Sequence, residues 1–192
     1  MAFSSTSVGT LRVCTFPEFR LFADPIGEGS FVQSDVACDL CGQMRGWKYA
    51  IEVDYDNPSL TVCPWCIKDG TAGARGYLFN DSEIYPAFQG VSQLTPDEAE
   101  EVERRTPGFV TWQGNRWQMC CGRACRYLGE ADAEDLQGRW ADAVGSLFEH
   151  DADWSEIAKS DLISNIRKAN GPCAYIFQCV VCSKHRGYWD CH

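Results

Sequence analysis

The sequence lacks several features that would assign it to a common class of protein. No run of apolar residues reaches the ~18 that a membrane-spanning helix needs, so we expect no membrane segment. Residues 1–10 contain no charged start followed by an apolar stretch, so no secretory signal peptide is predicted. Glycine-rich phosphate loops, nucleophile elbows and His-Glu-x-x-His motifs are also missing. These absences favour a cytoplasmic protein that is not an enzyme.

Basic residues are scarce relative to acidic ones. The chain has 17 Lys and Arg residues against 27 Asp and Glu residues, a net charge of −10. Nucleic-acid binding requires a basic surface that contacts phosphates, so this balance argues against DNA or RNA as a partner. A protein partner that is itself basic fits the charge better.

Cysteine, by contrast, is abundant, with 12 residues in a chain of 192. A framework of disulfides is typical of small secreted proteins, and no secretory signal is predicted here. In a cytoplasmic protein, paired Cys-x2-Cys spacings favour bound zinc. We therefore expect the cysteines to hold metal ions rather than to form disulfides.

The same cysteine pattern occurs near both ends of the chain. The Cys38–Cys41 and Cys179–Cys182 pairs are each followed, after three residues, by Arg-Gly and an aromatic residue. Such a pair directs two sulfurs towards one ion, and tetrahedral zinc needs four ligands. The Cys63–Cys66 pair follows the first repeat after 21 residues, which is zinc-ribbon spacing. We predict that the first zinc site consists of Cys38, Cys41, Cys63 and Cys66.

The Cys179–Cys182 pair needs two further ligands. Cys121 and Cys125 are four residues apart and share a face if a helix begins there, whereas Cys120 would point away. We predict that a second zinc ion is held by Cys121, Cys125, Cys179 and Cys182, with Cys120, Cys191 and His192 open as substitutes. Sites made of four thiolates are closed and stabilise a fold rather than activate water.

Two other uses of the cysteines stay open. Cys63-Pro64-Trp65-Cys66 has the spacing of a thioredoxin-type redox pair, so a thiol–disulfide protein is one alternative. Such a pair, however, needs no second pair at ribbon spacing. A zinc ribbon that binds nucleic acid is the other alternative, which the acidic charge disfavours.

The spacing of apolar residues predicts an α+β fold. We expect two zinc-ribbon-like β-hairpin lobes with a helical segment of about three helices between them. The hairpins comprise residues 31–53 and 174–189. One helix begins at Thr95 with a capping box and ends before Pro107, and longer helices are predicted at residues 132–149 and 153–168. One face of the helix at 132–149 is apolar and consists of Leu136, Trp140, Ala143, Val144, Leu147 and Phe148.

These elements predict three parts within one compact unit. Residues 1–20 form a flexible tail, residues 21–90 a zinc-ribbon lobe, and residues 91–192 a helical lobe that is closed by the second knuckle.

Acidic residues are concentrated between Glu130 and Asp161. That segment holds ten acidic residues and two basic ones, Arg139 and Lys159, a net charge of −8. A charged helix face is commonly just a solvated surface. An acidic face also attracts a basic protein and speeds its association. We predict that partner-binding residues on this face are Glu134, Asp135, Asp142, Glu149, Asp151, Asp153 and Glu156.

Short motifs run along nearly the whole chain. They include Phe22-Ala23-Asp24-Pro25-Ile26, Cys63-Pro64-Trp65-Cys66-Ile67, Arg105-Thr106-Pro107-Gly108-Phe109, Cys121-Gly122-x2-Cys125, and Ala174-Tyr175 ahead of the last knuckle. In this combination the sequence resembles the CbrC family of bacterial proteins. At Cys120, where the resemblance implies histidine, the sequence departs from the family pattern.

The resemblance implies a role rather than a reaction. CbrC proteins are associated with tolerance to a nuclease colicin and have no established enzyme activity. By this resemblance, the chain is expected to protect a bacterial cell from a protein toxin. It would act as an immunity-type protein that covers a basic toxin with its acidic face.

Overall fold

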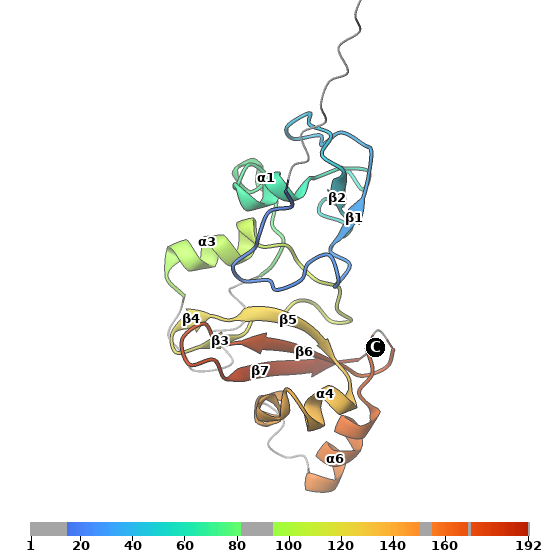
Figure 1. Ribbon diagram of the computed structural model, residues 1–192, viewed down its shortest axis with the longest axis vertical. Coiled ribbons are helices and arrows are strands. Elements are labelled where there is room, and N and C mark those ends of the chain that lie inside the picture. Colours follow the sequence, from blue (N-terminus) through green and yellow to red (C-terminus); the bar gives the residue numbers. More distant parts are fainter. Residues whose placement is uncertain (1–14, 82–93, 150–154, 169, 192) are drawn as a thin grey trace, which may run out of the picture.

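A three-stranded antiparallel sheet forms the centre of the molecule. The computed structural model describes residues 15–81, 94–149, 155–168 and 170–191. The strands β5 (Arg126–Ala131), β6 (Cys173–Gln178) and β7 (His185–Asp190) lie in the order β5-β6-β7. The N-terminal elements lie on one side of this sheet and the helices α4 and α6 on the other (Figure 1). The predicted α+β class, with two cysteine-bearing hairpin lobes and helices between them, is confirmed.

Strand β6 separates two apolar cores. Its side chains alternate, so that Cys173, Tyr175 and Phe177 join the core that contains the N-terminal aromatic residues. Ala174 and Ile176 join the second core, which lies under the helices. All five residues are buried, which is expected of a strand that is covered on both faces.

The N-terminal lobe consists of short elements around aromatic residues. Strand β1 (Phe31–Gln33) pairs with β2 (Trp47–Tyr49), and the helix α1 (Pro64–Lys68) and the 3₁₀ turn η1 (Gly73–Arg75) follow. Phe16 and Phe19, which the prediction places in a tail, pack on Phe31 with ring centroids 5.3 and 5.9 Å away. The predicted tail therefore does not extend to these residues, and residues 1–14 lie outside the described residues.

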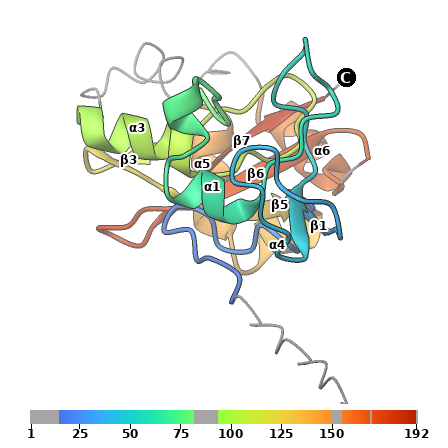
Figure 2. The ribbon, with the colours of Figure 1, turned by 90° about the horizontal axis from the view of Figure 1, so that it is seen from above.

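Helix α3 (Pro96–Arg105) begins and ends where the sequence predicts. The Thr95 hydroxyl accepts a hydrogen bond from the amide of Glu98, which caps the first turn. Although α3 falls within the predicted helical lobe, its Val102 is buried in the same core as the aromatic residues of the N-terminal lobe. Figure 2 shows α3 beside α1, on the same side of the sheet.

The prediction of one continuous helix at residues 132–149 is wrong. The structure divides this segment into α4 (Ala133–Gln137), a 3₁₀ turn η2 (Ala141–Ala143) and α5 (Val144–Leu147). Gly138 ends α4 with φ −116° and ψ −108°, outside the helical region. Most of the apolar face predicted for this segment is nevertheless buried, namely Leu136, Trp140, Ala143, Leu147 and Phe148, while Val144 is partly buried.

Helix α6 (Glu156–Asn165) lies within the predicted range of 153–168. The hydroxyl of Ser155 accepts a hydrogen bond from the amide of Ala158 at 3.2 Å and caps its start. Leu162 and Ile163 are only partly buried against the second core. Among the described residues, no helix has both the length and the apolar character to cross a membrane.

A short hairpin before β5 is tied to α3 by charge. It consists of β3 (Met119–Cys120) and β4 (Arg123–Ala124). The guanidinium of Arg123 donates to the carboxylate of Glu98 at 2.7 Å, and Glu98 is almost fully buried. Glu98 therefore anchors the hairpin to α3.

Candidate metal centres

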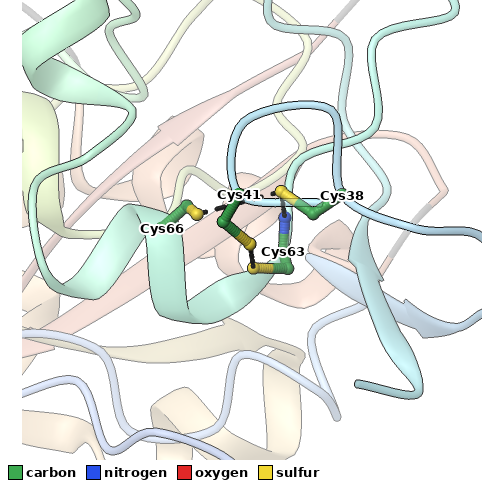
Figure 3. A group of neighbouring side chains, drawn as sticks. All are labelled: Cys38, Cys41, Cys63 and Cys66. Atoms are coloured by element: carbon green, nitrogen blue, oxygen red, sulfur yellow. Dashed lines mark hydrogen bonds between the residues drawn. The ribbon is translucent and has the colours of Figure 1, made fainter. Parts of the chain in front are cut away.

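Four cysteines of the N-terminal lobe converge on one point. Cys38 and Cys41 come from the loop after β1, and Cys63 and Cys66 come from the start of α1 (Figure 3). Their sulfur atoms all lie within 4.8 Å of one another. These are the four residues that the sequence predicts for the first site, and the structure brings all of them together.

The sulfur spacing fits a tetrahedral ion. The Cys38–Cys66 and Cys41–Cys63 sulfur pairs are each 3.8 Å apart. Four sulfurs that each lie ~2.3 Å from a central zinc ion would be separated by about 3.8 Å. Four thiolates in this arrangement would hold zinc or iron, and the ion would cross-link the loop to the helix.

Backbone hydrogen bonds shape the first knuckle. The Cys38 amide donates to the carbonyl of Gln43 at 3.0 Å, and the Gly42 amide donates to the carbonyl of Cys38 at 2.7 Å. Gly42 has φ +69°, a left-handed conformation that glycine adopts without steric cost. Cys63 precedes the first turn of α1, with Pro64 at its first position, and its amide donates to the Cys38 sulfur at 3.4 Å.

The second knuckle repeats this loop. The Cys179 amide donates to the carbonyl of Lys184 at 2.9 Å, and the Ser183 amide donates to the carbonyl of Cys179 at 3.0 Å. Ser183 stands at the position of Gly42 and has φ +60°. The amides of Val181 and Cys182 both donate to the Cys179 sulfur at 3.4 Å. The repeated sequence pattern is therefore a repeated structure.

The second cysteine group contains Cys120 in place of the predicted Cys125. Its members are Cys120, Cys121, Cys179 and Cys182, and their sulfurs again lie within 4.8 Å of one another. The Cys120 sulfur is 3.8 Å from the sulfurs of both Cys121 and Cys182. This group therefore has the same sulfur spacing as the first.

The prediction of Cys125 is wrong because no helix begins at Cys121. Cys121 and Gly122 both have positive φ, +54° and +70°, and form the two-residue turn between β3 and β4. The turn presents Cys120 and Cys121 together, while Cys125 is fully buried and its amide donates to the carbonyl of Gln118 at 2.9 Å. The Cys-Gly dipeptide was the sequence signal for this turn.

The first cysteine of each hairpin knuckle has a lowered pKa. Burial opposes ionisation of Cys179, but the amides of Cys182 and Val181 outweigh it and lower its pKa to about 7. Burial likewise opposes ionisation of Cys38, and backbone donors again outweigh it and lower the pKa. Burial instead raises the pKa of Cys63 to about 11 and that of Cys120 to about 12. One cysteine in each group therefore has a pKa below that of a free thiol and ionises more readily.

The two groups differ in exposure. Cys38, Cys63 and Cys66 are each only 2 % exposed, and Cys41 is partly buried. In the second group Cys179 is buried and Cys120 partly buried, whereas Cys121 and Cys182 are exposed. All cysteines within the described residues are free thiols. Among those outside both groups, Cys173 is buried and its thiol donates to the carbonyl of Arg167 at 3.2 Å.

The arginines that follow the two knuckles make contacts within the molecule. The Arg45 guanidinium lies over the ring of Trp65, 5.1 Å from its centroid. Arg186 pairs with Glu149. The partly buried His185 pairs with Asp142, at 2.8 Å between Nδ1 and the carboxylate.

The predicted partner-binding acids divide into three sets. Asp135 forms ion pairs with Arg139 and Lys168, and Glu149 forms one with Arg186, while the carboxylate of Asp142 contacts the ring of His185. Glu134 and Glu156 are exposed, as are Asp142 and Glu149, and Glu156 forms an ion pair with Lys159 at 3.0 Å. Asp151 and Asp153 lie outside the described residues.

Comparison with known proteins places the chain in one family. The pattern of an uncharacterised protein family, UPF0167, matches residues 16–191. A UPF0167 protein of Pseudomonas aeruginosa is 34% identical over 170 residues, which cover 88% of this chain and 93% of the relative. UPF0167 proteins of Mycobacterium bovis and Mycobacterium tuberculosis are each 34% identical over 179 residues, covering 91% of this chain and 92% of the relative.

No solved structure matches the chain. These comparisons do not name the CbrC family, so the resemblance to it stays a prediction. Because the family pattern and the relatives both extend over nearly all of the sequence, the chain belongs to the UPF0167 family.

Proposed function

We propose that the chain is a cytoplasmic, non-enzymatic binding protein whose two cysteine groups each hold a structural zinc ion. The observation that carries this proposal is the sulfur spacing of 3.8 Å in both groups, which suits a tetrahedral ion with four thiolates. Such a site has no open position for water or substrate, so the ion supplies stability rather than reactivity. The function then lies in the surface that these sites support.

Elemental analysis of the purified protein tests the metal part of the proposal. We expect about two zinc ions per chain, and the same analysis detects iron, the other ion that suits four thiolates. Cobalt substitution should give the absorption bands of tetrahedral cobalt thiolate. A preparation that contains no metal, and takes up none when refolded with zinc, would overturn this part.

The surface we propose for binding is the acidic helical side of the sheet, and the partner is a basic protein. The net charge of −10 and the excess of acids between residues 130 and 161 support this choice, because opposite charge accelerates association. Glu134 and Glu156 are exposed members of the predicted set, on α4 and α6. The resemblance to CbrC proteins suggests that this partner is a nuclease toxin.

Binding to the purified nuclease domain of a colicin tests the partner. We expect complex formation that weakens with salt, and loss of nuclease activity in the complex. The double variant Glu134→Gln/Glu156→Gln should reduce the association rate several-fold. Asp97→Asn/Glu100→Gln removes the same charge from the exposed side of α3 and serves as the control. Absence of a complex at low salt would overturn the toxin proposal and leave the metal sites untouched.

A further inference from the structure

The second cysteine group combines features that the first does not share. It has the same sulfur spacing, yet two of its four thiols, Cys121 and Cys182, are exposed. Cys182 lies in a loop whose neighbours Val181, Ser183 and Lys184 are exposed as well. A dissolved reagent can therefore reach this group without any opening of the fold.

We propose that the second group is an oxidation site, at which hydrogen peroxide joins Cys120 to Cys182 and releases the bound ion. The first group keeps its ion under the same conditions. The ion release rests on the metal binding proposed above, whereas the disulfide depends only on the geometry of the cysteines.

The sulfur distances favour Cys120 and Cys182 as the pair that reacts. Cys182 is exposed and meets the peroxide, and the Cys120 sulfur lies 3.8 Å from it. Cys121 is equally close to Cys120 but adjacent in sequence. Neighbouring Cα atoms are about 3.8 Å apart, less than the ~4.4–6.8 Å that a disulfide normally spans. Cys179 is buried and is held by two amide donors, so it is the least free to move.

The chemistry balances in two steps. The Cys182 thiolate attacks one peroxide oxygen, the O–O bond breaks, and the departing hydroxide takes up a proton to form water. The Cys182 sulfenic acid is then attacked by the Cys120 thiolate, the S–O bond breaks, and the second hydroxide leaves as water after protonation. The two sulfurs lose two electrons in total, which reduce one peroxide to two waters.

Loss of two thiolates leaves Cys121 and Cys179 as the remaining ligands of the second group. Two thiolates no longer close a tetrahedral zinc site, so the ion is released. In the first group, three of the four cysteines are only 2 % exposed and belong to the main core. Peroxide therefore reaches them only when the N-terminal lobe opens.

Peroxide treatment of the metal-loaded protein tests the proposal with two independent readouts. A chromogenic chelator should report release of about one of two ions. Tryptic peptide mapping, with fragmentation of the linked peptides to locate the bond, should show Cys120 of the peptide Trp117–Arg123 joined to Cys182. Release of both ions at the same rate, or a link confined to Cys63 and Cys66, would overturn the proposal.

Two variants separate the chemistry from general instability. Cys182→His keeps a zinc ligand but removes the thiol, so the ion should stay bound under peroxide and the link should be absent. Cys173→Ser removes a buried thiol outside both groups and should leave release unchanged. If the untreated protein contained no metal, the proposed function would fail. The peptide map would still decide the oxidation site, because the link then either forms selectively or does not.

Discussion

The two cysteine groups share one loop but occupy different surroundings. Both knuckles are closed by the same pair of backbone hydrogen bonds, and both direct amides at their first sulfur. Cys38 and Leu40 of the first loop belong to the core cluster against which Phe16, Trp47 and Trp65 pack. The second lies at the end of β6 and β7, where Val180 and Val181 are exposed. Local sequence thus determines the shape of a knuckle, and the surrounding chain determines its protection.

Removal of one ligand from each group should show the largest contrast. Cys66→Ala is expected to lose one ion and unfold the N-terminal lobe, because structural zinc contributes about 10–16 kcal/mol to folding in zinc-finger peptides. Cys182→Ala should also lose one ion, with a smaller loss of stability because its site is at the surface. Metal content together with thermal unfolding measures both. If Cys182→Ala unfolded the protein more completely, the comparison of the two groups would be reversed.

Cys120 and Cys125 offer a sharper test of the second group. Cys120→Ser should reduce the metal content by one ion per chain. Cys125→Ala should keep both ions and cost only about 1 kcal/mol, the effect of a small cavity in a core. Elemental analysis and chemical denaturation distinguish the two variants. Loss of an ion from Cys125→Ala would restore the ligand set that the sequence predicts.

Gly42 and Ser183 occupy the same left-handed position in the two knuckles, so substitutions there compare the two loops directly. Gly42→Ser should destabilise the protein by about 1–2 kcal/mol, because a side chain is strained at φ +69°. Ser183→Gly relieves the same strain at φ +60° and should raise stability by less than about 1 kcal/mol. Denaturant midpoints provide the measurement. Equal effects of the same sign would contradict the equivalence of the two knuckles.

The smallest predicted change is a loss of stability in acid, when Asp135 becomes protonated. Burial opposes ionisation of Asp135, but Arg139 and Lys168 outweigh it and lower its pKa from 3.8 to about 2. A carboxyl whose pKa is lowered on folding adds stability above its unfolded pKa. This contribution is lost as the pH falls from near 3.8 towards 2.

We expect a contribution of about 1 kcal/mol, because solvent screens the half-exposed Arg139 and Lys168. The stability of wild type minus that of Asp135→Asn, measured against pH, isolates this term from protonation of the cysteines. If the stability difference between wild type and Asp135→Asn did not change between about pH 5 and pH 2, the ion pairs of Asp135 would be excluded as its source.

Sequence reasoning was most successful where the signal is local. The cap at Thr95, the two knuckles and the apolar set around Leu136 depend on short spacings, and the structure agrees with them. The failures involve choices that local spacing leaves open. A Cys-Gly turn and a helix start both suit residues 121–125, and the turn is the arrangement that brings Cys120 and Cys121 to Cys179 and Cys182. Gly138 could have continued a helix, but it leaves the helical region with φ −116° and ψ −108°, and α4 ends there.

The positions of the cysteines also determine how much chain each ion would confine. In the first group Cys38 and Cys66 are 28 residues apart, whereas Cys120 and Cys182 in the second are 62 apart. Closing the longer loop costs about 0.7 kcal/mol more conformational entropy. If an ion stays bound to its cysteines when the chain unfolds, the ion of the second group closes the longer loop. It therefore restricts the conformations of the unfolded chain more. The more accessible ion is thus also the one whose departure gives the chain the most freedom.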